Sequence, residues 1–143
     1  MQNMHGRTAG FTLLELLIVI TIVGLLATVA LPGYQQSVLI GGRSEGRALL
    51  LQVAANQERY YSDHHTYSGN ADPLVSPAVV VLNSESGLYR VSVASCPDGG
   101  IQHCFIATAT PTGRQLADTC QTLTVTQTGR KGATGGTAEE CWR

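Results

Sequence analysis

The stretch GFTLLELLIVITIVGLLATVAL at residues 10–31 decides how this chain folds. From Phe11 to Leu31 it is almost entirely apolar, and a helix of this length would be about 31 Å long, enough for a hydrocarbon core of about 30 Å. Glu15 is the one charged residue in the run. A charge at the centre of a bilayer costs about 2.5–3.5 kcal/mol, so such residues usually have a functional partner. The alternative is a tolerated carboxylate that reaches back to the membrane interface.

The flanks of the run indicate how it is used. A secretory signal has a shorter apolar core of about 7–15 residues and a small-residue exit, for which Thr28-Val29-Ala30 is only a weak match. The length therefore favours a retained membrane helix over a cleaved signal. Arg7 precedes the run, and this weak charge bias agrees with an N-terminus on the cytoplasmic side.

Gly24 and Pro32 mark places where the helix is expected to bend or loosen, since proline removes a backbone donor and clashes with the preceding turn. The helical pattern nevertheless continues to about Tyr61. Its second half is amphipathic, with a core-facing stripe of Leu49, Val53 and Tyr60 and a polar side of charged and amide residues. Arg43 falls on that polar side, and the glycine pair at 41–42 is expected to weaken the helix.

Beyond the helix the pattern changes to that of a sheet. Residues 62–87 are rich in turn formers and read as a connection, with a short strand or packed segment at 79–82. Three β-prone runs follow, at residues 88–94, 104–110 and 123–127. A long helix followed by an antiparallel meander of three to four strands predicts an α+β fold.

Four cysteines lie beyond the apolar run, at positions 96, 104, 120 and 141. An even set favours an oxidising compartment and two disulfides, for which three connectivities exist. Cys96 and Cys104 flank a predicted hairpin turn, so we expect them to pair, which leaves Cys120 for Cys141. A zinc site is the competing interpretation, but the chain has no C-x-x-C pair.

The N-terminal block closely resembles the type IV pilin family. The resemblance rests on the Gly10–Phe11 junction, the run from Thr12 to Val19, and Gly24 with the later Leu31-Pro32-Gly33-Tyr34. It implies that a prepilin peptidase cuts after Gly10 and that the new N-terminal residue, Phe11, is N-methylated. It also implies that Glu15 neutralises the N-terminal amine of a neighbouring subunit during assembly, and that the helix loosens between Gly24 and Pro32 in the fibre.

The second half of the chain narrows the resemblance to the PilE-type minor pilins, which are similar to the minor pilins that act in DNA uptake. The matching residues are Gln57-Glu58-Arg59-Tyr60-Tyr61-Ser62, Asp118-Thr119-Cys120, Leu123-Thr124, Gly129, Lys131-Gly132-Ala133 and Glu140-Cys141-Trp142-Arg143. Cys96 and Cys104 depart from that pattern. The pilin reading divides the chain into a leader (1–10), a membrane and filament-core helix (11–33), an amphipathic helix (34–62), a connection (63–87), a sheet (88–127) and a disulfide-bounded end (128–143).

The remaining polar residues give weaker signals. Arg114, Arg130 and Lys131, with Arg143 and Trp142, could form a small basic and aromatic patch for DNA, against the alternative of an ordinary solvated surface. The chain carries a net charge of −1 and so has no broad basic field. The adjacent His64 and His65 are more typical of an exposed loop than of a metal site.

We therefore expect a structural minor pilin and not an enzyme, since no nucleophile, phosphate or dinucleotide motif occurs. No cofactor or metal is expected. The partners that the resemblance implies are other pilins, the prepilin peptidase, an inner-membrane assembly platform, the lipid bilayer before assembly and, as a further candidate, DNA. The expected location is the inner membrane and then the extracellular pilus, with roles in twitching motility and surface attachment. The alternatives are a DNA-receptor pilin and a type II secretion pseudopilin, and the cysteines at 120 and 141 argue against the latter.

Overall fold

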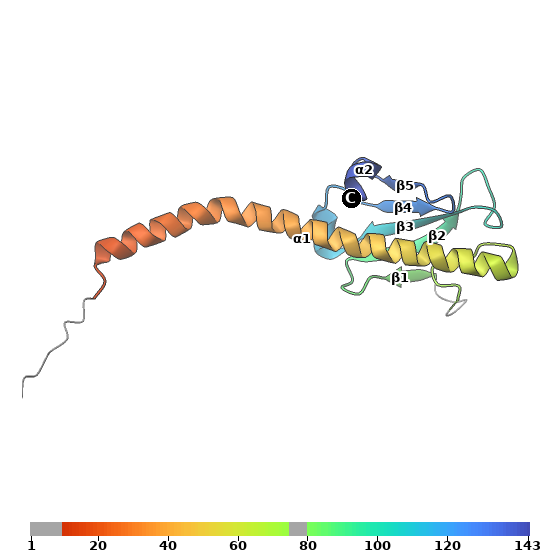
Figure 1. The fold of residues 1–143 in the computed structure, drawn as a ribbon, viewed down its shortest axis with the longest axis horizontal. Helices are drawn as coiled ribbons and strands as arrows, with labels where there is room; N and C mark the ends of the chain where they lie inside the picture. The colour runs from red at the N-terminus through yellow and green to blue at the C-terminus, as the bar shows by residue number, and fades with distance from the viewer. Residues whose placement is uncertain (1–9, 75–79) are drawn as a thin grey trace, which may run out of the picture. The chain divides into compact units, whose positions relative to one another are not determined.

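The computed structural model describes residues 10–74 and 80–143 (Figure 1). The chain forms two compact units, residues 1–37 and 38–143, and we call the second unit the head domain. The elements follow one another as α1 (Leu13–His64), β1 (Val81–Asn83), β2 (Tyr89–Ser95), β3 (Phe105–Pro111), the 3-10 helix η1 (Gly113–Ala117), β4 (Leu123–Thr126), β5 (Lys131–Ala133) and α2 (Ala138–Cys141).

The first unit consists of the N-terminal part of α1, whose apolar side chains are exposed almost throughout. Its few hydroxyls are satisfied within the helix, since Thr21 donates to the Leu17 carbonyl and Thr28 to the Leu25 carbonyl, each at 2.7 Å. A polar side chain that returns its hydrogen bond to its own backbone is tolerated in an apolar medium. This unit therefore buries nothing by itself and needs an apolar surrounding.

The sheet of the head domain is antiparallel throughout, in the order β1-β2-β3-β4-β5. Each strand pairs with its neighbour in sequence, as antiparallel pairing permits, and the connection between β3 and β4 carries η1. Buried and more exposed positions alternate along β2, β3 and β4. One face of the sheet is therefore apolar and the other faces solvent.

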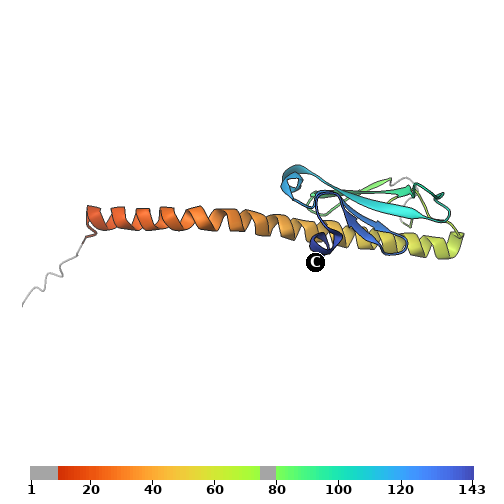
Figure 2. The same ribbon diagram turned by 90° about the horizontal axis from the view of Figure 1, so that it is seen from above.

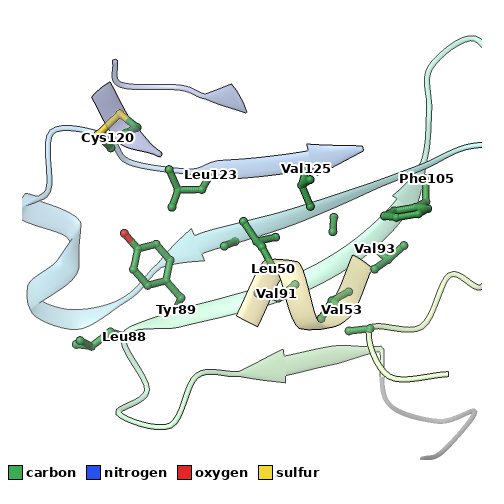
Figure 3. Packing of buried hydrophobic residues seen from close by; sticks show 14 of the residues in the cluster. Leu50, Val53, Leu88, Tyr89, Val91, Val93, Phe105, Cys120, Leu123 and Val125 are labelled. Carbon is green, nitrogen blue, oxygen red and sulfur yellow. A yellow bond between two sulfur atoms is a disulfide. The ribbon is translucent and has the colours of Figure 1, made fainter. Parts of the chain in front are cut away.

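Residues 38–64 of α1 lie along the apolar face (Figure 2). Leu50 and Val53 of the helix are fully buried there against the three long strands (Figure 3). The strands contribute Tyr89, Val91, Val93, Phe105, Ala107, Ala109, Leu123 and Val125 to this core. Burial of each large aliphatic side chain contributes about 1.5–3 kcal/mol, so this one layer of contacts holds the helix to the sheet.

The helix continues through the glycine pair at 41–42, and two of its glycines, Gly42 and Gly46, have a packing reason. A Cβ at Gly46 would come within 2.8 Å of the Tyr89 ring, and a Cβ at Gly42 would overlap the Gln115 side chain. Glycine costs a helix about 1 kcal/mol relative to alanine. At these two positions the loss is accepted because the helix can then approach β2 and η1 closely.

The sheet has five strands rather than three to four. The two additional strands, β1 and β5, have three residues each and lie at the two edges. Strands this short show no alternation in sequence, and their pairing partners alone define them. Residue 79, which we expected to belong to the first of them, lies outside the described residues. The main helix begins two residues later and ends three residues later than expected.

Gln57 and Tyr61, two side chains of α1, hold the loop that follows the helix. The buried Gln57 donates to the Asn70 carbonyl at 2.7 Å and accepts from the Ser68 N–H at 2.9 Å, so both ends of its amide are satisfied. Tyr67 then packs on Tyr61 and on the edge of Phe105, with ring centroids 4.6 and 4.8 Å apart. The loop is thereby part of the core at one end of the sheet.

Candidate functional site

The start of α1 is capped by its own sequence. Thr12 precedes the helix, and its Oγ1 accepts a hydrogen bond from the Glu15 N–H at 3.2 Å. This is half of the capping box, the T-x-x-E pattern in which a threonine side chain satisfies a free N–H of the first turn. The pattern is readable in the sequence, and it gives Thr12 a defined structural role.

Glu15 lies in that first turn, where a negative charge is favoured by the helix dipole. Its side chain is exposed, and no basic group of residues 10–74 and 80–143 forms an ion pair with it. Phe11, Glu15, Leu16, Val19 and Ile20 line one shallow groove. The position thus combines an unpaired carboxylate with an exposed apolar surface.

The apolar part of α1 is long and apolar enough to cross a membrane, by length and composition. Gly24 and Pro32 both lie within the helix. The helix therefore begins at Leu13 and runs without interruption past both residues. Loosening of the helix between Gly24 and Pro32 in a filament stays a prediction.

Lys131 and Trp142 meet at the β5 edge of the head domain. The Lys131 ammonium lies 5.1 Å from the centre of the Trp142 ring, a cation–π distance. The indole N–H donates to the Gly132 carbonyl at 3.0 Å, which fixes the half-buried ring on β5. Arg143 is next in sequence and pairs with Glu139 at 3.3 Å, in a contact that is largely exposed.

Arg130 adjoins this edge, in the tight turn between β4 and β5. The turn is closed by the Gly129 N–H to the Thr126 carbonyl at 2.8 Å and by the Thr126 N–H to the Arg130 carbonyl at 3.1 Å. Gly129 has φ +74°, a conformation that favours glycine. The Arg130 side chain is exposed and forms no ion pair with any residue that the structure describes.

Arg114 does not join this group. In the β3–β4 register Ile106 faces Thr126, so the β4–β5 turn lies beyond the Ile106 end of β3. Arg114 belongs to η1, which follows the opposite end of β3 at Pro111. At about 3.4 Å per residue those two ends are about 17 Å apart. The structure therefore brings Arg130, Lys131 and Trp142 to one edge and places Arg114 elsewhere.

Arg43 is buried, although its sequence position suggested a polar surface. Its guanidinium makes two hydrogen bonds to the Asp118 carboxylate, one through Nε at 2.9 Å and one through the second terminal nitrogen. Asp118 also accepts from Gln115 at 3.1 Å and from the Tyr89 hydroxyl at 3.3 Å, and Gln115 donates to the Leu39 carbonyl at 2.9 Å. This buried polar network ties α1 to η1 and to the residues just before Cys120.

The pKa of Asp118 follows from these contacts. Burial on its own raises that pKa, but the hydrogen bond from Arg43, the Cys120 N–H, the Arg43 charge and the Gln115 amide together lower it below its ordinary value. The hydrogen bond with Asp118 raises the pKa of Arg43, and burial raises that of Tyr89 to about 12. Arg43 and Asp118 therefore both stay charged in the folded head domain at neutral pH.

Two disulfides are present, Cys96–Cys104 in the loop between β2 and β3, and Cys120–Cys141 between the start of the β4 segment and α2. The second closes a loop that carries the whole β5 edge, and such a cross-link contributes about 2–4 kcal/mol. Thr137 caps α2 by accepting from the Glu140 N–H at 3.3 Å. Lys131 and Trp142 are thus held on a cross-linked and capped segment.

The histidines expected to be exposed lie at the end of α1. The His64 ring stacks on Tyr60 with centroids 4.0 Å apart, and its Nδ1 lies 3.0 Å from the Tyr60 carbonyl oxygen. His65 follows with φ 54°. Within residues 10–74 and 80–143, no group of three or more histidine, cysteine or acidic residues is placed to hold a metal ion.

Comparisons with known proteins show which protein family the chain belongs to. Residues 32–124 match the family model described as "Type IV minor pilin ComP, DNA uptake sequence receptor", and residues 6–31 match the prokaryotic N-terminal methylation motif. Fimbrial protein EcpC of Eikenella corrodens is 33% identical over 124 residues, which cover 87% of this chain and 77% of EcpC.

Other relatives match a shorter part. A fimbrial protein of Neisseria meningitidis serogroup B (strain ATCC BAA-335 / MC58) is 40% identical over 63% of this chain, and the match spans only 51% of that protein. A solved type IV pilin from Shewanella oneidensis is 27% identical, covering 65% of this chain and 89% of that chain, with a TM-score of 0.48. The long helix, the antiparallel sheet and the two family matches together define the chain as a type IV pilin.

Within that class, the chain belongs to the family of type IV minor pilins whose model it matches over more than half of its length. The pilins are a structural protein family. The methylation motif includes Gly10, Phe11 and Glu15, whereas the minor pilin match ends at residue 124 and so includes Arg114 but neither Arg130 nor Lys131.

Proposed function

We propose that this chain is made as a precursor in the inner membrane, cut after Gly10 by a prepilin peptidase and N-methylated on Phe11. An inner-membrane assembly platform then adds it to the base of a type IV pilus, among other pilins. The observation that carries the proposal is the exposed apolar half of α1 with a first-turn carboxylate that forms no ion pair with any residue in 10–74 or 80–143. Such a helix can be stable in a bilayer or in the packed core of a filament, but not in water.

Glu15 sets the register in this proposal. Cleavage after Gly10 creates a positive amine on Phe11, and a neighbouring subunit's Glu15 is its partner in a water-poor core. An unpaired charge is costly there, so a subunit at the wrong height is disfavoured. The apolar groove that Phe11 and Glu15 share supports a contact in which both residues are covered together. Loosening of the helix between Gly24 and Pro32 would let it fit among its neighbours.

Cells that lack the prepilin peptidase test the route. We expect the chain to remain at full length in the inner-membrane fraction of such cells and to be absent from sheared pili, because the leader blocks both the new amine and the packing around it. In cells with the peptidase, the shortened chain should appear in both fractions. An uncut chain in sheared pili would contradict the proposed route, whereas soluble release of the whole chain would contradict the membrane step.

We further propose that the β5 edge of the head domain binds DNA while the subunit is part of the pilus. Support comes from the arrangement of Arg130, Lys131 and Trp142 at one exposed edge, and from the DNA receptor named in the matching family model. Lysine and arginine contacts to phosphates supply affinity for DNA of any sequence. The chain is nearly neutral, so this would be a local patch rather than a broad field. Motility and attachment would come from the filament as a whole.

Replacement of Arg130 and Lys131 by alanine tests this surface. In the full chain in detergent, we expect the double variant to bind duplex DNA about tenfold more weakly and to lower the salt slope by about 2, because two phosphate contacts are lost. Arg114→Ala is the matched control, since it removes a cation from the opposite end of β3 and should leave the salt slope unchanged. A double variant that binds as tightly as the wild type, or a control that binds as weakly as the double variant, would reject the β5 edge as the DNA surface.

A further inference from the structure

A cleft lies where the disulfide loop after β2 approaches the turn between β4 and β5. Both connections lie at the same end of the sheet (Figure 1). The lining comes from the loop residues Cys96, Pro97, Asp98 and Cys104, from Ile106 of β3, and from Thr126, Gln127, Thr128 and Arg130. Its volume is about 340 Å³, within the range of about 300–1,000 Å³ that is typical of small-ligand sites.

The cleft combines an apolar surface with polar side chains, which include Thr126 and Thr128 with their hydroxyls 3.0 Å apart. Pro97, Ile106 and the disulfide supply the apolar surface, and Asp98, Gln127 and Arg130 supply a carboxylate, an amide and a guanidinium. The Gln127 Oε1 lies 3.1 Å from the Cys104 sulfur. Its Nε2 donates to no acceptor among residues 10–74 and 80–143, so a pair of N–H donors is left for a ligand.

This chemistry does not suit a phosphate alone. Arg130 would attract a phosphate, but the Asp98 carboxylate in the same cleft would repel it. A nucleobase can bind both the carboxylate and the amide of the cleft, because its edge carries donors for the first and acceptors for the second. Its faces are apolar and can lie against the apolar surface. Only a base that is out of its pair can enter a concave site, since in a duplex the base edges lie within the grooves and the phosphates project.

We propose that this cleft accepts one unpaired DNA base, with Asp98 and Gln127 at the edge of the base and Arg130 at the adjoining phosphate. The inference rests on the proposed DNA binding by the β5 edge and adds to it a place where base identity is read. Arg130 lies at the boundary between the phosphate-binding β5 edge and the cleft, so it belongs to both sites. Amino-bearing bases, above all cytosine, suit the Asp98 carboxylate better than thymine.

The test compares short duplexes that differ only at one position, titrated with the full chain in detergent. One duplex is fully paired, one has a single bulged cytosine, and one has a bulged abasic nucleotide, which keeps the extra backbone unit but offers no base. We expect the bulged cytosine to bind about tenfold more tightly than the other two, a difference of about 1.4 kcal/mol, because only it offers a base edge to the cleft. Gln127→Ala and Asp98→Asn should each remove most of that difference. Gln127→Ala should leave binding to the paired duplex unchanged, and Asp98→Asn should not weaken it, because that variant removes a negative charge beside Arg130.

Gln102→Ala is the matched control, because Gln102 is exposed in the same disulfide loop but does not line the cleft. It should keep the preference for the bulged base. Equal binding of all three duplexes by the wild type would overturn the base site while leaving the DNA-binding edge in place. No binding to any duplex would refute the proposed DNA binding itself. A preference that survives both Gln127→Ala and Asp98→Asn would place the base elsewhere and also overturn the inference.

Discussion

Replacing Glu15 with glutamine should leave this pilin folded and inserted in the membrane but reduce its incorporation into pili by at least about tenfold, since breaking a buried charge pair costs about 3–5 kcal/mol. Glutamine keeps the size of the side chain and still fits the capping box, which accepts either residue at this position. Only the negative charge is lost, so the amine of the neighbouring Phe11 would be left unpaired. Quantitative immunoblots of sheared pili and of membranes measure the ratio.

Thr12→Ala separates this role from a local one. It removes the hydroxyl that accepts from the Glu15 N–H, at a cost of about 1 kcal/mol to the helix start, but leaves the carboxylate in place. We expect this variant to enter pili almost normally. If Thr12→Ala and Glu15→Gln fail equally, capping rather than charge pairing explains the position. If Glu15→Gln is incorporated at the wild-type level, the proposed role in setting register is wrong.

Replacing Asp118 with alanine should destabilise the head domain by about 3–5 kcal/mol, because the buried Arg43 would lose its partner. Urea unfolding followed by fluorescence measures the change, since Trp142 is the only tryptophan of the chain and lies in the head domain. The double variant Arg43→Leu with Asp118→Leu should recover much of the loss. Glu139→Ala is the control: it breaks the exposed pair with Arg143 and should cost less than about 0.5 kcal/mol.

Acid should abolish the same contribution. The pKa of Asp118 is lowered in the folded state, so the stabilisation is fully present above the unfolded value of about 3.9 and is lost as the pH falls through the folded value. The free-energy difference between the wild type and Asp118→Ala should therefore shrink when unfolding is measured below about pH 4. A difference that stays constant into strong acid would mean that the carboxylate charge is not what holds the network together.

Local sequence signals predicted much of this structure. The apolar run at residues 11–31 predicted a membrane-length helix, the alternation in residues 88–94, 104–110 and 123–127 predicted the strands β2, β3 and β4, and four cysteines predicted two disulfides. The helix and strand signals are each contained in a short stretch of chain, and the even number of cysteines needs no knowledge of which of them pair. The T-x-x-E pattern at residues 12–15 was equally local, and it could have predicted the helix cap.

What could not be predicted depends on partners far along the chain. Arg43 reads as a surface residue of the helix until Asp118, 75 residues later, is placed beside it. The edge strands β1 and β5 are too short to show a pattern and form only because a neighbour pairs with them. The sequence shows which residues are basic but not which of them lie together. The register of β3 and β4 decides that Arg130 lies with Lys131 and that Arg114 does not.

The most direct test of the central claim is the intact mass and N-terminal sequence of the chain recovered from sheared pili. The account predicts a single species that begins at N-methylated Phe11, lacks the ten residues up to Gly10 and contains both disulfides. A chain that begins at Met1, or one cut after Ala30, would contradict it, because the first keeps the leader and the second has lost the helix that packs in the filament.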